Sequence, residues 1–261
     1  MNKALKAVVF DWAGTMIDFG SRAPVVALCK VFEAAGVPIS EAEARADMGK
    51  SKNDHIASIL SMPRVAEAWT AAHGKAPDET DVETLFTDIA PMMREAAREC
   101  AVLIPGAADV VARLRESGVK IGSCTGYTRE MMTDILPRAE EQGYKPDMLV
   151  CAGDTAEGRP SPLMLWKNLV ELGAWPATAC VKVDDAEIGI AEGRAAGVWT
   201  IGVAASGNAV GLSAEEYAAL STEERTARVS AAREKLEKAG AHLVIDTVAD
   251  LPEALAKLSI G

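Results

Sequence analysis

Short apolar segments alternate with longer helical patterns along most of this chain. The first is Ala7-Val8-Val9-Phe10, which ends at Asp11, and similar segments span residues 119–124, 148–152, 179–183, 199–204 and 243–245. Near-continuous apolar strands are typical of a parallel sheet that is buried on both faces. Strands that alternate with helices form right-handed βαβ units. The sequence therefore predicts an α/β fold with a doubly wound, Rossmann-like parallel sheet.

Residues 20–100 interrupt this alternation, because they contain helical patterns and no candidate strand. Capping-box patterns mark two helix starts in this stretch, Ser40 with Glu43 and Thr80 with Glu83. We therefore expect two domains. An α/β core spans residues 1–19 and 101–261, and an all-helical cap over residues 20–100 is inserted directly after the first strand.

The charge balance argues against several classes of partner. The chain has 27 Lys+Arg and 38 Asp+Glu, a formal net charge of −11, which disfavours a nucleic-acid or anionic-membrane surface. No apolar segment is long enough to span a bilayer, and the N-terminus lacks the pattern of a signal peptide. The five cysteines are widely spaced and form no CxxC motif, which predicts reduced thiols in a cytoplasmic protein. A catalytic cysteine is the weaker interpretation, because no partner base is marked.

Four polar clusters lie where predicted strands end, at residues 11–15, 123–127, 158–160 and 184–185. In open parallel sheets, ligands bind beyond the carboxyl ends of the strands. Asp11 taken alone fits slightly better as a loop residue that accepts backbone hydrogen bonds. Together, Asp11 and Asp185 at neighbouring strand ends repel each other unless a cation lies between them. A few oxygen ligands of this kind suit Mg²⁺ completed by water and a substrate phosphate.

Thr125 and Arg159 are candidates for holding an anionic substrate. The Thr125 hydroxyl and adjacent backbone N–H groups suit phosphoryl oxygens, although a plain turn threonine is an equally good interpretation. The Arg159 guanidinium is a planar fork that matches phosphate, and its alternative is a surface arginine paired with Glu157. A chain of net charge −11 needs such local cations to bind an anion.

These four clusters, in this order, resemble the haloacid dehalogenase superfamily of phosphotransferases. The resemblance covers the whole predicted core, and the helical insertion matches the superfamily's common cap position. It implies that Asp11 is a nucleophile. Phosphatases of this superfamily carry a second aspartate two residues later, which protonates the leaving alcohol, whereas this chain has Ala13. General acid catalysis on an oxygen leaving group is therefore disabled at that position.

Lys52 offers another way for a leaving group to depart. A lysine amine condenses with a carbonyl to form an iminium. The iminium is an electron sink, which would stabilise the carbanion left when a carbon–phosphorus bond breaks. From sequence alone, an exposed helix lysine is nevertheless the favoured interpretation of Lys52.

Four segments narrow the resemblance to the phosphonoacetaldehyde hydrolase (phosphonatase) family, namely residues 10–15, 48–55, 122–129 and 142–147. The resemblance extends from Ala7 to Asp250. It implies a hydrolase that acts on carbon–phosphorus bonds and converts phosphonoacetaldehyde to acetaldehyde and phosphate. The implied route passes through a Schiff base on Lys52 and an aspartyl phosphate on Asp11.

The same resemblance implies a set of site residues. The catalytic residues would be Asp11, Lys52, His55 acting through a water, and Tyr127. The substrate-binding residues would be Met48, Gly49, Thr125, Gly126 and Arg159. The metal ligands would be Asp11, Asp185 and the backbone carbonyl of Ala13, with Mg²⁺ as the cofactor. A homodimer through the cap helices is also implied, and its surface or, more simply, the core of the cap would contain Ile56, Ile59, Leu60 and Trp69.

Five positions complicate the family pattern. Three are replacements: Met16 stands in place of a frequent threonine, Arg22 in place of a common phenylalanine, and Gly189 in place of a frequent second acidic residue. The other two are rivals of predicted site residues, namely Asp184 beside Asp185 and the amine of Lys50 near Lys52. Arg22 weighs most, because a new cation near the cleft could recruit a different anion. Two alternatives stay open. One is another superfamily hydrolase, acting on a carbon–halogen bond or a related phosphonate, and the other is a catalytically silent phosphonate-binding protein.

Overall fold

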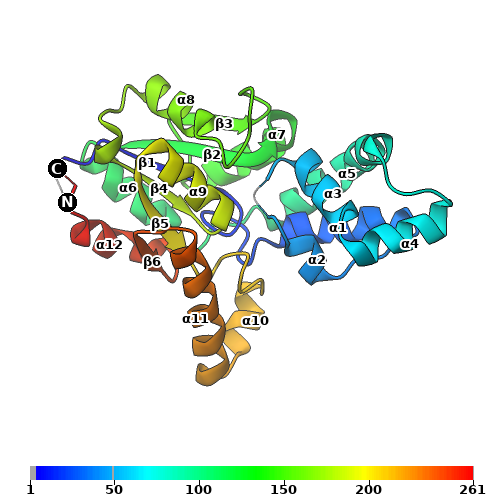
Figure 1. The fold of residues 1–261 in the computed structure, drawn as a ribbon. Coiled ribbons are helices and arrows are strands. Elements are labelled where there is room, and N and C mark those ends of the chain that lie inside the picture. The colour runs from blue at the N-terminus through cyan, green and yellow to red at the C-terminus, as the bar shows by residue number, and fades with distance from the viewer. Residues whose placement is uncertain (1–3, 49, 261) are drawn as a thin grey trace.

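The computed structural model describes residues 4–48 and 50–260, and Figure 1 shows an α/β core beside a group of helices. Within these residues the core holds one six-stranded sheet, ordered β3-β2-β1-β4-β5-β6, in which all neighbouring strands are parallel. The strands are β1 (Ala7–Phe10), β2 (Lys120–Thr128), β3 (Met148–Ala152), β4 (Cys180–Asp184), β5 (Trp199–Val203) and β6 (Leu243–Ile245). They lie where the apolar segments predict them, and the doubly wound parallel sheet is confirmed.

Helices cover both faces of the sheet. Successive side chains of a strand point to opposite faces, so one strand contributes to the packing on both sides. In β1, Val8 and Phe10 belong to the main core cluster, whereas Ala7 and Val9 pack in a second cluster with Leu165. The core helices are α6 (Ala107–Glu116), α7 (Arg129–Glu141), α8 (Leu163–Leu172), α9 (Glu187–Ala196), α10 (Ala214–Ala219), α11 (Thr222–Lys238) and α12 (Leu251–Lys257), with short 3-10 turns at Ala177–Ala179 and Val248–Asp250.

Strand β2 is longer than its apolar segment predicts. It continues to Thr128, and its pairing with β3 shifts register between Thr125 and Thr128. Such an irregularity bends the backbone and redirects side chains. The bend falls on the segment that carries several predicted site residues.

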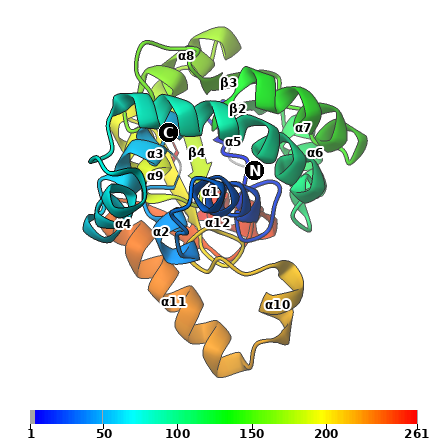
Figure 2. The ribbon, with the colours of Figure 1, turned by 90° about the vertical axis from the view of Figure 1, so that its right-hand side faces the viewer.

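Five helices form a group between β1 and α6: α1 (Arg22–Ala34), α2 (Glu41–Arg45), α3 (Lys52–Leu60), α4 (Pro63–His73) and α5 (Glu79–Cys100). Figures 1 and 2 show this group beside the sheet, with the long α5 running across it. No strand is present in its described part, as the sequence predicts. We propose that residues 20–100 form a cap domain on a core of residues 1–19 and 101–261.

Side chains at the helix starts explain two of these boundaries. Ser40 and Glu43 form the predicted capping box of α2. The second predicted box, Thr80 with Glu83, is wrong. Helix α5 is capped by Asp78, whose side chain accepts the Asp81 N–H. Aspartate caps a helix at least as well as threonine, so the helix begins at the earlier residue.

The apolar residues considered for a dimer surface are internal. Ile56, Ile59, Leu60 and Trp69 are buried in the main core cluster, so the interpretation as cap core is confirmed. Among the described helices, none has the length and apolarity that a membrane crossing requires.

Candidate active site

Residues of the core and of the helical group meet around one cavity of about 30 Å³. The predicted site residues that line it are Asp11, Ala13, Met48, Lys52, Thr125, Gly126, Tyr127, Arg159 and Asp185. Asp11 and Asp185 come directly after β1 and β4, as expected for a parallel sheet, whereas residues 125–127 lie within the last part of β2. Lys52 is the first residue of α3. Gly49 lies outside the described residues. The fold therefore collects most of the predicted set from segments that are far apart in the sequence.

Arg159 is buried against Asp11. Its Nη1 donates to Oδ1 of Asp11 at 2.8 Å, and its Nη2 donates to the backbone carbonyl of Cys124 at 2.6 Å. The Arg159 side chain is only 2% exposed, so the alternative of a surface arginine paired with Glu157 is wrong. A guanidinium in this place fixes the Asp11 carboxylate and offers positive charge to an anion.

Three buried carboxylates, those of Asp11, Asp184 and Asp185, each place an oxygen within 4.8 Å of the others. Burial, followed by repulsion from Asp184, raises the pKa of Asp11 to about 6. Burial and the charges of Asp11 and Asp184 raise the pKa of Asp185 well above its ordinary value. Crowded carboxylates of this kind are unfavourable without a cation. Because the donors are all oxygens, the residues fit a hard divalent metal ion.

The Asp185 carboxylate is held from two sides. Oγ1 of Thr15 donates to Oδ1 at 3.3 Å, and the backbone N–H of Asn208 donates to Oδ2 at 2.7 Å. Gly14 has a φ of +81°, and a Cβ there would lie 2.3 Å from Oδ2 of Asp185. The loop after β1 can pass this close only because Gly14 lacks a side chain. Asn208 was not predicted, since no local motif marks it.

Lys52 is a buried amine without an acidic partner. The residue is 3% exposed, so its interpretation as an exposed helix lysine is wrong. No ion pair to Lys52 is present in the described part of the chain, and its Nζ lies 5.9 Å from the centroid of the Tyr127 ring. Burial lowers the pKa of Lys52 to about 8, although the charge of Asp11 opposes this shift. Part of the lysine is therefore neutral near neutral pH, as a nucleophilic amine must be.

The rival amine, Lys50, is already engaged. Its Nζ forms an ion pair with Asp47 at 3.0 Å and donates to Oγ of Ser58 at 3.2 Å. Lys50 lines the same cavity, but its charge is compensated. Lys52 is therefore the better candidate for an uncharged nucleophile.

His55 and Tyr127 have well-defined protonation states. Burial, followed by the positive charge of Lys52, lowers the pKa of His55 to about 3, so its ring is neutral. Burial and the charge of Asp18 raise the pKa of Tyr127 well above its ordinary value, so its hydroxyl stays protonated. Tyr127 lines the cavity, whereas His55 is not among the described residues that do. A role for His55 through a water stays a prediction.

Two buried residues that were not predicted complete the charge network. Nζ of Lys182, in β4, lies 3.1 Å from Oδ2 of Asp184 and 3.3 Å from Oε2 of Glu192. Glu192, in α9, also lies 3.0 Å from Nε of Arg159. Burial and the charge of Arg159 work to lower the pKa of Lys182, but Glu192 and Asp184 outweigh them and the pKa is raised. A sequence signal did exist: a lysine inside the apolar segment 179–183 requires a buried anion.

Two of the positions that complicate the family pattern, Gly189 and Asp184, lie side by side. A Cβ at position 189 would lie 2.0 Å from Oδ2 of Asp184, so the Asp184 carboxylate fills the space that a side chain on Gly189 would need. Asp184 is fixed there by the N–H of Ala186 at 3.0 Å and by Lys182. Asp184 is thus an acidic group that lies directly beside position 189.

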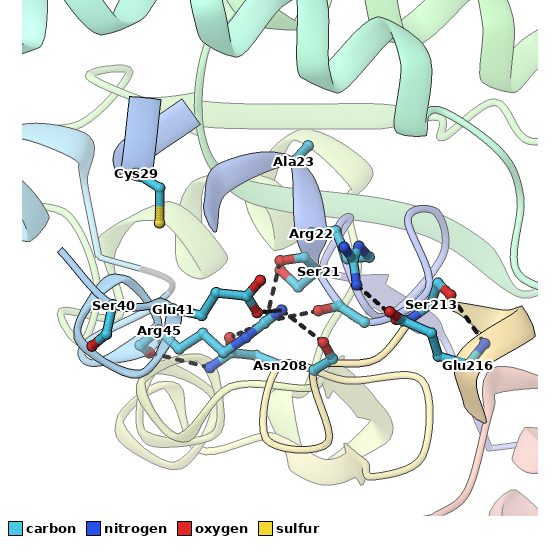
Figure 3. A network of polar contacts seen from close by, with 12 residues as sticks. Ser21, Arg22, Ala23, Cys29, Ser40, Glu41, Arg45, Asn208, Ser213 and Glu216 are labelled. Carbon is cyan, nitrogen blue, oxygen red and sulfur yellow. Dashed lines mark hydrogen bonds and ion pairs between the residues drawn. The ribbon is translucent and has the colours of Figure 1, made fainter. Parts of the chain in front are cut away.

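The remaining departures lie away from the cavity. Nη1 of Arg22 pairs with Oε2 of Glu216 at 2.8 Å, between side chains that are 31% and 52% exposed (Figure 3). Its charge is compensated at the surface, so it offers no free cation to a bound anion. Met16 is buried in the main core cluster.

The cysteines show no sign of activation. Burial is the largest influence on all five thiols and raises the pKa of Cys29, Cys100, Cys124, Cys151 and Cys180. Since the thiolate is the reactive form, the preference against a catalytic cysteine is supported.

Comparisons with known proteins point in one direction. The model of the haloacid dehalogenase-like hydrolase family matches residues 5–197. The phosphonoacetaldehyde hydrolase of Paraburkholderia xenovorans (strain LB400) is 50% identical over 249 residues, which cover 95% of this chain and 93% of that protein. The enzyme of the same name from Vibrio cholerae (strain O395) is 42% identical over 99% of this chain and 96% of its own. The crystal structure of a phosphonoacetaldehyde hydrolase-like protein from Oleispira antarctica superposes with a TM-score of 0.96 at 43% identity, covering 97% and 92% of the two chains.

Proposed function

This chain belongs to the phosphonoacetaldehyde hydrolases of the haloacid dehalogenase-like family, and we propose that it hydrolyses phosphonoacetaldehyde to acetaldehyde and phosphate. The observation that carries the proposal is Lys52, a buried amine with a lowered pKa on the same cavity as Asp11. Such an amine attacks aldehydes, whereas hydrolysis of a phosphate ester has no step that uses it.

Lys52 begins the reaction. Its neutral amine adds to the aldehyde carbon and, after loss of water, leaves an iminium. A pKa of about 8 leaves about a tenth of Lys52 neutral at pH 7, compared with about 3 in 10⁴ at the ordinary lysine pKa. The Tyr127 ring faces the amine, with 5.9 Å between Nζ of Lys52 and the ring centroid, and its protonated hydroxyl is the proposed carrier of the proton that this step requires.

Asp11 then attacks phosphorus in line, and the electrons of the carbon–phosphorus bond flow into the iminium to give an enamine. Arg159, the Thr125 hydroxyl and the backbone N–H groups of the bent β2 end hold the phosphoryl oxygens. Mg²⁺, when bound by Asp11, Asp185 and the Ala13 carbonyl, supplies further positive charge to those oxygens. Water cleaves the aspartyl phosphate, and protonation and hydrolysis of the enamine free Lys52. The sum consumes one water.

Ala13 is consistent with a carbon leaving group. Protonation of an ester oxygen by an acid at this position would assist an alcohol to leave. A carbon atom gains nothing from that acid, because its electrons are taken up by the iminium. The electron sink on Lys52 therefore replaces the missing acid.

The closed site also protects the intermediates. Asp11, Lys52 and Arg159 are 8%, 3% and 5% exposed, and the cavity between core and cap is small. Substrate access therefore requires that the helical group move away from the core. Its return excludes bulk water and brings the amine to the phosphonate.

The decisive experiment compares phosphate release from phosphonoacetaldehyde with Mg²⁺ by the wild type, Lys52→Arg and the matched control Lys50→Arg. Arginine keeps the charge but forms no imine. We expect Lys52→Arg to lose a factor of about 10³ or more, and Lys50→Arg to stay within a few-fold. Borohydride added with substrate should attach a two-carbon group to Lys52. Equal turnover by the two variants, or attachment at Lys50, would contradict the assignment.

Two further outcomes would redirect the proposal. Turnover of a halogenated substrate that survives EDTA would favour a metal-independent carbon–halogen hydrolase. Tight phosphonate binding without turnover would favour a silent binding protein. The homodimer implied by the family resemblance and the cytoplasmic location predicted from the cysteines stay predictions, and light scattering of the purified chain tests the first.

A further inference from the structure

We propose that Arg45 is a positioning residue that clamps the helical group onto the core, and that Asn208 couples this clamp to Asp185 at the metal site. Figure 3 shows the contacts of Arg45, including the one with Asn208. They join the end of α2 to the backbone before α1 and to the loop that follows β5, which is called here the 204–213 loop.

The Arg45 guanidinium is surrounded by acceptors outside the helices of its own group. Nη1 donates to the carbonyl of Gly20 at 2.8 Å and to Oδ1 of Asn208 at 3.1 Å, and Nη2 donates to the carbonyl of Gly211 at 2.8 Å. Within the group, its ion-pair partner is Glu41 at 3.9 Å. The side chain is 15% exposed, and separation of the group from the core would remove its two contacts with the 204–213 loop, those to Asn208 and Gly211.

The backbone around the guanidinium is shaped to receive it. Gly211 has a φ of +70°, and a Cβ there would lie 2.8 Å from Cζ of Arg45. Gly20 donates its N–H to the carbonyl of Ser206 at 2.7 Å, and a Cβ on Gly20 would lie 2.1 Å from the carbonyl oxygen of Leu212. Two glycines thus allow the segment before α1, the 204–213 loop and Arg45 to pack closely.

Asn208 touches both sides of this interface. Its side chain accepts from Nη1 of Arg45 and returns a hydrogen bond from Nδ2 to the Arg45 carbonyl at 3.3 Å. Its backbone N–H donates to Oδ2 of Asp185 at 2.7 Å. The next residue back, Gly207, packs so closely that a Cβ there would lie 2.8 Å from Cβ of Asp185. The position of Asp185 therefore depends on a loop that Arg45 holds.

A large cavity runs along the clamp. It has a volume of about 600 Å³, and Arg45, Met48, Asp185 and Asn208 are among its lining residues. Met48, Asp185 and Ala186 line both this cavity and the small cavity of the reacting groups. If the 204–213 loop is ordered only when Arg45 makes these contacts, closure of the helical group onto the core increases the affinity for the metal. Metal binding then favours closure by the same factor, because thermodynamic linkage is reciprocal.

The test uses the purified full chain, with Arg45→Ala, Arg45→Lys and the control Arg64→Ala. Arg64 is a second arginine of the helical group, but its guanidinium binds Glu43 within that group. Calorimetry measures Mg²⁺ affinity without substrate, and amide hydrogen exchange measures opening of the 204–213 loop. We expect Arg45→Ala to weaken Mg²⁺ binding about tenfold or more and to speed exchange in the loop. Arg45→Lys should recover part of both, and Arg64→Ala should match the wild type.

Unchanged Mg²⁺ affinity in Arg45→Ala would overturn the coupling, and unchanged loop exchange would overturn the clamp. If Arg45→Ala does not fold, Asn208→Ala replaces it. This variant keeps the backbone N–H to Asp185 but loses the contacts of the Asn208 side chain with Arg45, and wild-type Mg²⁺ affinity would again overturn the coupling.

The inference rests on the proposed function only for the identity of the metal. A wild type inactive on phosphonoacetaldehyde, with the expected shifts in affinity and exchange, would refute the proposed function and leave the clamp intact.

Discussion

Two buried lysines lie at this site with opposite electrostatics. Lys52, in α3, has no ion pair among the residues that the structure describes, and burial lowers its pKa to about 8. Lys182, in β4, is as deeply buried, and burial and Arg159 act to lower its pKa as well. The carboxylates of Glu192 and Asp184 reverse that effect, and the pKa of Lys182 is raised. The same side chain becomes a candidate nucleophile or a fixed cation according to whether an acid is within reach.

The difference follows from what each region contributes. The core contributes fixed charges at the carboxyl edge of its sheet, which is called the core edge below. Two cations form ion pairs there with three carboxylates, namely Arg159 and Lys182 with Asp11, Asp184 and Glu192. The helical group contributes the Lys52 amine and the packing that buries this amine away from water. Carbonyl chemistry, which needs a neutral amine, is thereby separated from phosphoryl chemistry, which needs charges. The closed arrangement brings the two together at one cavity.

The largest effect should come from Lys52→Met. We expect phosphate release to fall by a factor of about 10³ or more, because no imine forms. The free energy of unfolding should stay the same or rise, since a buried amine without an acidic partner is replaced by an apolar side chain of similar length. Phosphate assays and urea unfolding measure the two quantities. A loss of stability larger than about 2 kcal/mol would show that Lys52 is structural.

Lys182→Met should reverse that pattern. Removing Lys182 leaves Arg159 to compensate both Asp184 and Glu192, and we expect the free energy of unfolding to fall by about 3–5 kcal/mol. The matched control is Lys238→Met, because Lys238 pairs with Glu234 between side chains that are 74% and 65% exposed, and such pairs contribute less than about 1 kcal/mol. Equal losses in the two variants would refute the contrast between the lysines.

Exchanging the residue types at positions 184 and 189 tests whether the carboxylate beside Lys182 can come from either position. Gly189→Asp alone forces a second carboxylate into the space of Asp184, where a Cβ would lie 2.0 Å from Oδ2, and we expect a loss of about 2–3 kcal/mol. Asp184→Gly combined with Gly189→Asp should recover much of that loss, because one acid again faces Lys182. Thermal unfolding of the single and double variants measures this. A double variant no better than Gly189→Asp would show that the two positions are not interchangeable.

The sequence predicts the core edge better than the cap side. Apolar segments define the sheet, and parallel strands bring their carboxyl ends to one edge, so Asp11, Thr125 and Asp185 could be expected together. The state of Lys52 could not be predicted from its own segment. Its neighbours are polar, and its burial arises only when α3 packs over the core.

Long-range partners explain the other differences. Lys182 needed a buried acid, but nothing in its segment shows that the acid is Glu192 on the next helix. Asn208 acts on Asp185 through a backbone N–H, which any residue type except proline could provide. The start of α5 at Asp78, by contrast, could have been predicted from the sequence, because aspartate is itself a strong N-cap residue.

The smallest expected effect is the pH dependence of kcat/KM. Only neutral Lys52 attacks the aldehyde, so kcat/KM should rise about tenfold per pH unit below a pKa of about 8 and level off above it. The groups that face Lys52 are Asp11, His55 and Tyr127. The pKa values of Asp11 and His55, about 6 and about 3, bound the interval from about pH 6 to about pH 8 in which Lys52 alone sets the slope, and that of Tyr127 lies well above it.

The same shift has a consequence for folding. Between pH values of about 8 and about 10.5, the unfolded chain binds a proton at Lys52 that the folded chain does not. Lys52 therefore contributes a part of the stability that rises with pH in this window, so the free energy of unfolding of the wild type should increase relative to that of Lys52→Met as the pH is raised. Initial rates and urea unfolding across this range measure both effects. A kcat/KM profile that keeps rising through pH 8 without levelling off, with parallel stability curves for the two proteins, would mean that Lys52 keeps an ordinary pKa and that burial alone does not separate it from Lys182.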